Sequence, residues 1–209
     1  MRYYPIFLDL KEKKVFLAGG GKVALRKAET LLKAGAQITL SAPRILKTLA
    51  NLPGVTCLKK DFDPRDLTCE YALVIAATSD PGINRRVADK ARELKIPVNV
   101  VDVPELSSFI VPALLEKGDL QLAISSSGQA PGFSAWLRKE FSRELGPQTV
   151  KILTFLGNLR KNPQYLKLTP EQKRAFWKQV HQLQLLENLR AKNYLKLKKQ
   201  IEELWNNAG

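Results

Sequence analysis

One junction constrains the fold more than any other part of this chain: a short apolar strand runs directly into three glycines and then into a helix. The strand covers residues 15–18, and the glycines are residues 19–21. Apolar residues then recur at helical spacing from Ala24 to Leu32, until Gly35 ends the pattern. This order predicts an anion site at the helix start, because free backbone amides and the positive end of the helix dipole attract a phosphate.

The small residues of this loop match the pattern G-x-G-x-x-G/A, in which each position has its own role. Gly19 allows the tight turn, Gly21 lets the backbone approach a pyrophosphate, and Ala24 permits close packing of helix on strand. We therefore expect a dinucleotide to bind here. The residues predicted to contact it are Gly19, Gly20, Gly21, Lys22, Val23, Ala42, Pro43, Arg44 and Thr78.

The second predicted strand, residues 37–41, departs from the dinucleotide pattern. An Asp or Glu about 20 residues after the glycines ordinarily binds the ribose hydroxyls, but this strand ends in Ser41. Arg44 would suit the 2′-phosphate of NADP, or it caps the following helix. We expect NAD as the cofactor, and the sequence leaves NADP open.

Strands and helices then alternate along the first half of the chain. Residues 55–58, 72–77 and 98–101 are predicted strands, and Asp80 caps a helix that Pro81 opens. This alternation predicts a Rossmann-like, doubly wound parallel sheet of the α/β class. The carboxyl ends of its strands bring the glycine loop, Pro43, Thr78 and Asp102 to one edge of the sheet.

The alternation stops after Asp102. Residues 109–113 and 120–125 are predicted to form two strands around a turn at 117–119, and a helix follows from Pro131. Only helical spacing is visible beyond about Thr149. We therefore expect a dinucleotide-binding domain (1–113), a small α+β dimerisation and active-site region (114–146), and a helical module (147–209).

Composition is that of an ordinary globular protein, with 44% hydrophobic and 26% charged residues. The formal net charge is +14, and residues 146–209 hold twelve Lys and Arg against four Asp and Glu. This basic region could contact nucleic acid, hold an anionic small molecule or only keep the helices solvated.

Other features exclude some classes of protein. The first residues lack the pattern of a secretory signal and no apolar run spans a membrane, so we expect a cytoplasmic protein without a membrane partner. His181 is the only histidine, which excludes a His-rich zinc centre, and we predict no metal site. Cys57 and Cys69 are expected to be buried free thiols.

Five motifs in this order resemble the precorrin-2 dehydrogenase family, the N-terminal modules of siroheme synthases. The motifs are Gly19-Gly20-Gly21-Lys22-Val23-Ala24-Leu25-Arg26-Lys27-Ala28, Ala76-Ala77-Thr78-Ser79-Asp80, Asn99-Val100-Val101-Asp102, Ser108-Phe109-Ile110-Val111-Pro112 and Ile124-Ser125-Ser126-Ser127-Gly128. The resemblance runs from about Tyr4 to Leu145, and the helical tail matches less well. Without a methyltransferase domain after it, the chain resembles the standalone form.

The resemblance implies NAD-dependent oxidation of precorrin-2, an anionic tetrapyrrole, to sirohydrochlorin on the way to siroheme or cobalamin. It also implies a homodimer and, for some members, insertion of a ferrous or cobaltous ion into the product. Asp102 would be the catalytic base, whereas from the residues alone it equally suits a helix or turn cap. Ser126 would lie in the active-site region and be open to phosphorylation, or it is a polar turn residue.

Two alternatives from other classes remain at this point. The glycine loop and the basic tail also suit a nucleotide-sensing or nucleic-acid-binding protein, although no helix-turn-helix or aromatic platform for a single strand is visible. We therefore expect no nucleic acid partner. The other alternative is a scaffold that has lost catalysis and delivers tetrapyrrole to a partner.

Overall fold

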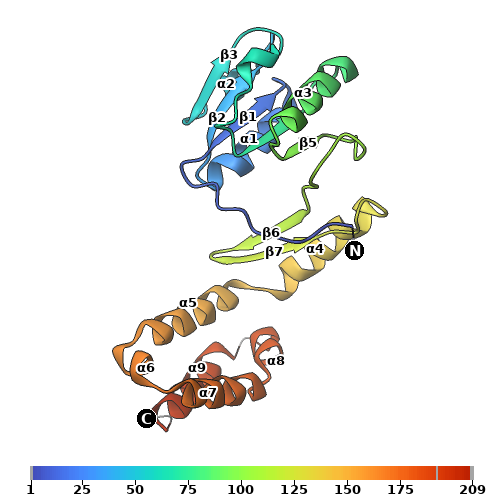
Figure 1. Cartoon of the computed structure of the whole chain (residues 1–209). Coiled ribbons are helices and arrows are strands. Elements are labelled where there is room, and N and C mark those ends of the chain that lie inside the picture. Colours follow the sequence, from blue (N-terminus) through green and yellow to red (C-terminus); the bar gives the residue numbers. More distant parts are fainter. Residues whose placement is uncertain (1, 192, 208–209) are drawn as a thin grey trace. The chain divides into compact units, whose positions relative to one another are not determined.

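The computed structural model describes residues 2–191 and 193–207, and its contacts divide the chain into two compact units, Met1–Val111 and Pro112–Gly209. The first unit is a parallel sheet between helices (Figure 1). Its elements are β1 (Lys14–Ala18), α1 (Lys22–Lys33), β2 (Gln37–Ser41), α2 (Lys47–Ala50), β3 (Val55–Leu58), the 3-10 helix η1 (Pro64–Asp66), β4 (Leu73–Ala76), α3 (Pro81–Glu93) and β5 (Val98–Val100).

The strands pair in the order β3-β2-β1-β4-β5, all parallel. The chain moves outward from β1 to β3 and then crosses to β4 on the other side of β1, so it is doubly wound. This confirms the predicted Rossmann-like class. The point where the order reverses lies at β1, whose carboxyl end carries the glycine loop.

Alternate residues of the strands form two cores, as the period of two in a strand requires. Phe16 and Ala18 of β1 face the cluster that includes Val87, Ala88 and Ala91 of α3. The next residues on the strand face the opposite cluster, which α1 and α2 cover with Ala24, Ala28, Leu31 and Leu49. The central strands are buried on both faces, which explains the continuous apolar run of β4.

The second unit combines one hairpin with helices (Figure 1). Its elements are β6 (Ala113–Lys117), β7 (Leu120–Ile124), α4 (Pro131–Glu144), α5 (Pro147–Lys161), α6 (Pro163–Lys167), α7 (Pro170–Gln182), α8 (Leu185–Arg190) and α9 (Tyr194–Asn206). A separate apolar core joins the helices around Phe176, Val180, Leu197 and Ile201. The helical tail predicted from the sequence is confirmed.

Two local predictions are wrong. The first strand of the hairpin is 113–117 rather than 109–113, because a two-residue turn at Gly118–Asp119 pairs Lys117 with Leu120 and so fixes the register. The cysteines are free, but Cys69 is exposed and Cys57 half-buried. The predicted boundary between 113 and 114 falls inside β6, and the three-part division stays a prediction.

Candidate active site

Gly19 ends β1 in a backbone conformation that only glycine adopts easily, with φ of +127°. Its N–H donates to the carbonyl of Ser41 at 2.9 Å, which ties the loop to the end of β2. A Cβ atom on Gly19 would lie 2.4 Å from the carbonyl oxygen of Ala77, just beyond β4. The strand therefore turns here within a gap that admits no side chain.

Gly20 and Gly21 serve different purposes. A Cβ atom on Gly20 would lie 2.0 Å from the carbonyl oxygen of Arg44, and the N–H of Leu46 donates to the Gly20 carbonyl at 3.0 Å. Gly20 is thus needed for packing against the loop after β2. A Cβ atom on Gly21 would meet nothing within 4 Å, so Gly21 faces open space.

The start of α1 fits an anion. Gly21 is the N-cap, no side chain caps the helix, and its first turn contains no acidic residue. The first backbone amides of the helix, including those of Lys22 and Val23, are therefore free to donate to a ligand. Open space above Gly21 leaves room for a pyrophosphate, so the residues present fit a dinucleotide.

The end of β2 offers less to a cofactor than the sequence suggests. The Ser41 side chain is buried, and its hydroxyl donates to the carbonyl of Lys60 at 3.1 Å. Ala42 is also buried, and its N–H donates to the carbonyl of Leu58. Of the predicted contacts in this loop, only Pro43 and Arg44 present exposed side chains.

Thr78, at the carboxyl end of β4, is held in place by Asn84 of α3. The Thr78 hydroxyl donates to Asn84 Oδ1 at 2.8 Å, and Asn84 Nδ2 donates to the Thr78 carbonyl at 3.0 Å. Asp80 caps α3 as predicted, accepting hydrogen bonds from Gly82 and Ile83. Asn84 was missed from the sequence, although a buried polar residue on the apolar side of α3 was a visible signal.

Asp102 lies in a turn directly after β5. Its φ is +60°, which aspartate tolerates better than most residues, and the Val103 N–H donates to the Val100 carbonyl across the turn. The Asp102 side chain is exposed, and within residues 2–191 and 193–207 no hydrogen bond or ion pair engages its carboxylate. The carboxylate is therefore available to a ligand.

Serine side chains brace this turn. Ser107 Oγ accepts from the Val100 N–H at 2.9 Å and donates to the Val103 carbonyl at 3.0 Å. Ser108 Oγ accepts from the Val98 N–H, and Asn99 Nδ2 donates to the Phe109 carbonyl. Residues 107–109 thus lie along β5 through these side-chain bonds and one backbone bond, from the Ser108 N–H to the Val98 carbonyl at 2.8 Å, an arrangement that sequence patterns did not predict.

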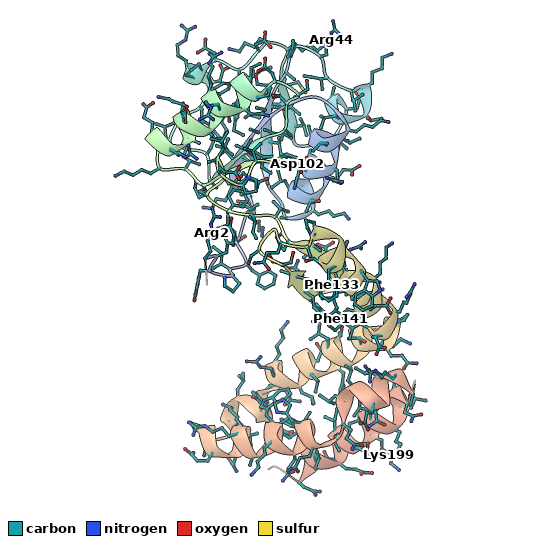
Figure 2. All side chains as sticks on the ribbon, turned by 90° about the vertical axis from the view of Figure 1, so that its right-hand side faces the viewer. Arg2, Arg44, Asp102, Phe133, Phe141 and Lys199 are labelled. Atoms are coloured by element: carbon teal, nitrogen blue, oxygen red, sulfur yellow. The ribbon has the colours of Figure 1, made fainter. Side chains whose placement is uncertain are left out.

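The parallel sheet places most predicted site residues at one edge. The glycine loop, Pro43 and Arg44, Thr78 and Asp102 follow the carboxyl ends of β1, β2, β4 and β5 respectively. Arg44 and Asp102 are well separated on the first unit (Figure 2), as expected from strands on opposite sides of β1. A ligand that reached both would have to extend across the glycine loop.

Ser126 belongs to the second unit, in the loop between β7 and α4. It is half-buried, and its hydroxyl accepts a hydrogen bond from the Ala130 N–H at 3.0 Å. The next residue, Ser127, has φ of +55°, and its N–H donates to Ser125 Oγ. The predicted turn is present, and a catalytic role for Ser126 stays a prediction.

Within the part of the chain that the structure describes, no three His, Cys, Asp or Glu side chains gather as metal ligands would. No described helix has both the length and the apolar character needed to span a membrane.

Comparison with known families adds to this geometry. Residues 6–113 match the model of a family described as putative NAD(P)-binding, which covers more than half of the chain. The chain belongs to this family. Its first unit is thus an NAD(P)-binding domain. Residues 117–144 match a second model, described as sirohaem biosynthesis protein, central. The resemblance to siroheme synthase modules predicted from the motifs is confirmed.

Similar proteins extend the match beyond the first unit. The chain is 35% identical over 188 residues to a siroheme synthase of Nitrosospira multiformis and 39% identical over 183 residues to siroheme synthase 3 of Aeromonas hydrophila. These alignments cover 87% and 86% of this chain. The chain spans only 40% and 39% of the length of these two curated relatives.

A solved structure supports the fold. The chain of "SirC, precorrin-2 dehydrogenase" is similar with a TM-score of 0.74 and 23% sequence identity, covering 96% of this chain and 100% of that one. The two chains therefore share a fold. In this chain the fold is a doubly wound sheet followed by further α+β and helical elements.

Proposed function

We propose that this chain is an oxidoreductase that oxidises precorrin-2 to sirohydrochlorin with NAD. One observation carries the proposal: Asp102, whose exposed carboxylate has no partner among the described residues, follows the carboxyl end of β5, at the same edge of the sheet as an uncapped glycine loop. The names of the relatives supply the substrate class, and the NAD(P)-binding family supplies the cofactor class.

The reaction removes a hydride and a proton from the tetrapyrrole. A bound nicotinamide would supply the acceptor for the hydride from a saturated ring carbon. Asp102 accepts the proton that leaves as conjugation extends, and its carboxylate becomes a carboxylic acid. Ser107 holds the Asp102 turn in place, so the carboxylate stays at the edge where substrate enters. Ser126 of the second unit is proposed to contact the substrate.

The cofactor would be held by backbone rather than by charged side chains. The free amides at the start of α1 would donate to its pyrophosphate, and Thr78, fixed by Asn84, would contact it beyond β4. We propose NAD rather than NADP, although no acidic residue stands directly after β2, where one would bind the ribose hydroxyls. Arg44 is an exposed cation directly after β2 and is proposed to meet a 2′-phosphate if NADP binds.

The test is a turnover assay. Precorrin-2 is generated in situ and mixed with the chain and either NAD or NADP, while nicotinamide reduction and the sirohydrochlorin spectrum are followed. Both signals should appear in step, faster with NAD. Absence of turnover with both cofactors would contradict the proposal. Adding ferrous or cobaltous ion to sirohydrochlorin in the same cuvette tests metal insertion, which we propose as a second use of the substrate site.

We also propose that the chain forms a homodimer through its second unit. Phe133 and Trp136 of α4 stack at 5.5 Å and are 56% and 50% exposed, and Phe141 on the same helix is 41% exposed (Figure 2). Such a row of exposed aromatic residues is typical of a protein interface. A monomeric mass in solution at micromolar concentration would contradict this proposal.

A further inference from the structure

Lys27 is a lysine on the apolar side of a helix. The buried residues of α1 are Ala24, Ala28 and Leu31, and Lys27 lies three residues after the first and four before the last. It therefore shares their face of the helix. Lys27 is half-buried, whereas Lys33 on the same helix is exposed. A lysine in this position calls for an explanation other than solubility.

The turn that carries Asp102 bridges the two sides of the sheet: Val103, after Asp102, packs on the α3 side, and the residue before Asp102 packs on the α1 side. Val101, the residue before Asp102, packs against the cluster that contains Ala24 and Ala28. Phe109, whose carbonyl accepts from Asn99 Nδ2, packs against the same cluster. The backbone around Asp102 and the apolar face of α1 are thus parts of one packed body, and Figure 2 shows Asp102 beside α1.

Three influences act on the Lys27 ammonium group. Burial is the largest and lowers its pKa, Arg26 lowers it further by repulsion, and the negative charge of Asp102 raises it. The balance leaves the pKa of Lys27 below its ordinary value. In the described ranges 2–191 and 193–207, no acidic side chain forms an ion pair with Lys27. Its charge is thus partly desolvated without a direct partner.

A lysine that only extends to water would keep its ammonium group hydrated and its stem on the apolar surface. That explanation does not account for a desolvated charge in the field of Asp102. Side chains on a helix lean toward its N-terminus, so the long stem of Lys27 leads back toward the edge of the sheet that holds the glycine loop. The ammonium group therefore approaches the region where a ligand would bind.

We propose that Lys27 binds an anionic oxygen of the ligand beside Asp102, and that this oxygen belongs to a carboxylate of the tetrapyrrole. The proposal rests on the proposed function, because it takes the substrate class from there. No ion pair joins Lys27 to Asp102, so both side chains can act on one substrate. Lys27 would hold a carboxylate while Asp102 faces the hydrogen that leaves.

A phosphate oxygen of the dinucleotide is the other anionic oxygen that would suit Lys27. Gly21 marks the start of α1, and Lys27 is six residues further, about 9 Å along the helix axis. The pyrophosphate would lie at the helix start, where the amides are free. Asp102, by contrast, follows Val101, which packs on the same cluster as Ala24 and Ala28 of α1. These observations favour the substrate carboxylate over the phosphate.

The experiment compares three variants of the full chain. Lys27→Met removes the charge but keeps the stem, Lys27→Arg keeps the charge, and Lys33→Met removes an exposed charge from the same helix as the control. Two bindings are measured without turnover: sirohydrochlorin by absorbance titration, and NAD by calorimetry. Steady-state kinetics with precorrin-2 add KM and kcat, and chemical denaturation confirms that each variant folds.

Lys27→Met should weaken sirohydrochlorin binding and raise KM by about 10- to 100-fold, the loss typical of a charge-assisted hydrogen bond. NAD affinity should stay unchanged, Lys27→Arg should recover most of the tetrapyrrole affinity, and Lys33→Met should behave as the wild type. A loss of NAD affinity instead would assign Lys27 to a phosphate and overturn the carboxylate assignment. Equal sirohydrochlorin affinity in Lys27→Met and wild type would overturn the proposal entirely.

The titration separates this proposal from the proposed function. A wild-type chain that binds sirohydrochlorin but does not oxidise precorrin-2 contradicts the dehydrogenase function alone, and the comparison of Lys27→Met with wild type still decides the role of Lys27. A wild-type chain that binds no tetrapyrrole overturns both.

Discussion

Two adjacent glycines in the loop should respond in opposite ways to the same small change. A methyl group on Gly20 would lie 2.0 Å from the Arg44 carbonyl oxygen and 2.9 Å from Ile45 Cα, so the backbone must move. A methyl group on Gly21 meets nothing within 4 Å. We predict that Gly20→Ala damages the fold, whereas Gly21→Ala spares the fold and damages cofactor binding.

The stability of Gly21→Ala follows from two small opposing terms. Gly21 has φ of −92° and ψ of −170°, which alanine adopts freely, so the less flexible unfolded chain favours the variant by about 0.4–1 kcal/mol. Alanine is a poorer N-cap than glycine, which costs roughly 0.5–1 kcal/mol. The free energy of unfolding should therefore change by less than about 1 kcal/mol.

Gly20→Ala lacks such compensation. Overpacking against backbone typically costs about 1–3 kcal/mol, and displacement of the loop weakens the hydrogen bond from the Leu46 N–H to the Gly20 carbonyl, which adds about 1 kcal/mol. The expected loss of unfolding free energy is about 2–4 kcal/mol. That is a large share of the roughly 5–15 kcal/mol typical of a folded domain.

Cofactor affinity, unlike stability, should be damaged by Gly21→Ala. The new methyl group of Gly21→Ala stands where a pyrophosphate must approach the free amides of α1. Loss of one hydrogen bond to a charged group, worth about 1.5–3 kcal/mol, weakens NAD binding about 10- to 100-fold. Urea denaturation and calorimetry with NAD measure the two quantities on the same samples.

Two results would refute this reasoning. Wild-type NAD affinity in Gly21→Ala would show that the pyrophosphate does not lie above Gly21. Wild-type stability in Gly20→Ala would show that the loop after β2 does not press against Gly20 as described.

Three other substitutions test the rest of the site. Asp102→Asn keeps a residue that tolerates φ of +60°, so turnover should fall at least about 100-fold while NAD affinity persists; lost NAD binding would indicate a structural role. Asn84→Ala removes the partner of the Thr78 N–H and carbonyl, while the Thr78 hydroxyl keeps its bond to the Asp80 carbonyl, so it should cost about 1–3 kcal/mol in urea denaturation; a cost near zero would contradict the bracing role. Trp136→Glu should convert the proposed dimer to a monomer by mass in solution, and an unchanged mass would place the interface elsewhere.

Sequence patterns predicted the elements of the first unit because each element is determined by residues close together in the chain. The apolar run of β4, the cap at Asp80 and the proline that opens α3 are each visible within a few residues. The misplaced strand before the hairpin shows where such rules fail. Residues 109–112 are apolar, but Phe109 is joined to β5 by the Asn99 side chain rather than by strand pairing. No local period reports such a contact.

The predicted site residues also differ in whether neighbouring sequence alone reveals their role. Residue type and position in the sequence were enough to predict that the glycine loop and Asp102 lie at the edge of the sheet. The packing role of Gly20 within that loop was not predictable in this way, because it depends on Arg44, which lies 24 residues away in sequence. Lys27 and Asn84 left a weaker signal, a polar residue within the apolar stripe of a helix. Such residues are worth testing in any sequence, because burial of a polar side chain requires a compensating contact.

At the end of β2, the residues that pack against the sheet differ from the residue expected to select between NAD and NADP. The Ser41 hydroxyl donates to the carbonyl of Lys60 and the Ala42 N–H donates to the carbonyl of Leu58, so both groups already have partners on the β3 side. The contacts of Arg44 with the glycine loop involve its backbone carbonyl, and its side chain is exposed. The side chain at position 44 can therefore change without moving the glycine loop. We therefore expect a substitution of Arg44 to test selectivity for a 2′-phosphate without disturbing the glycine loop.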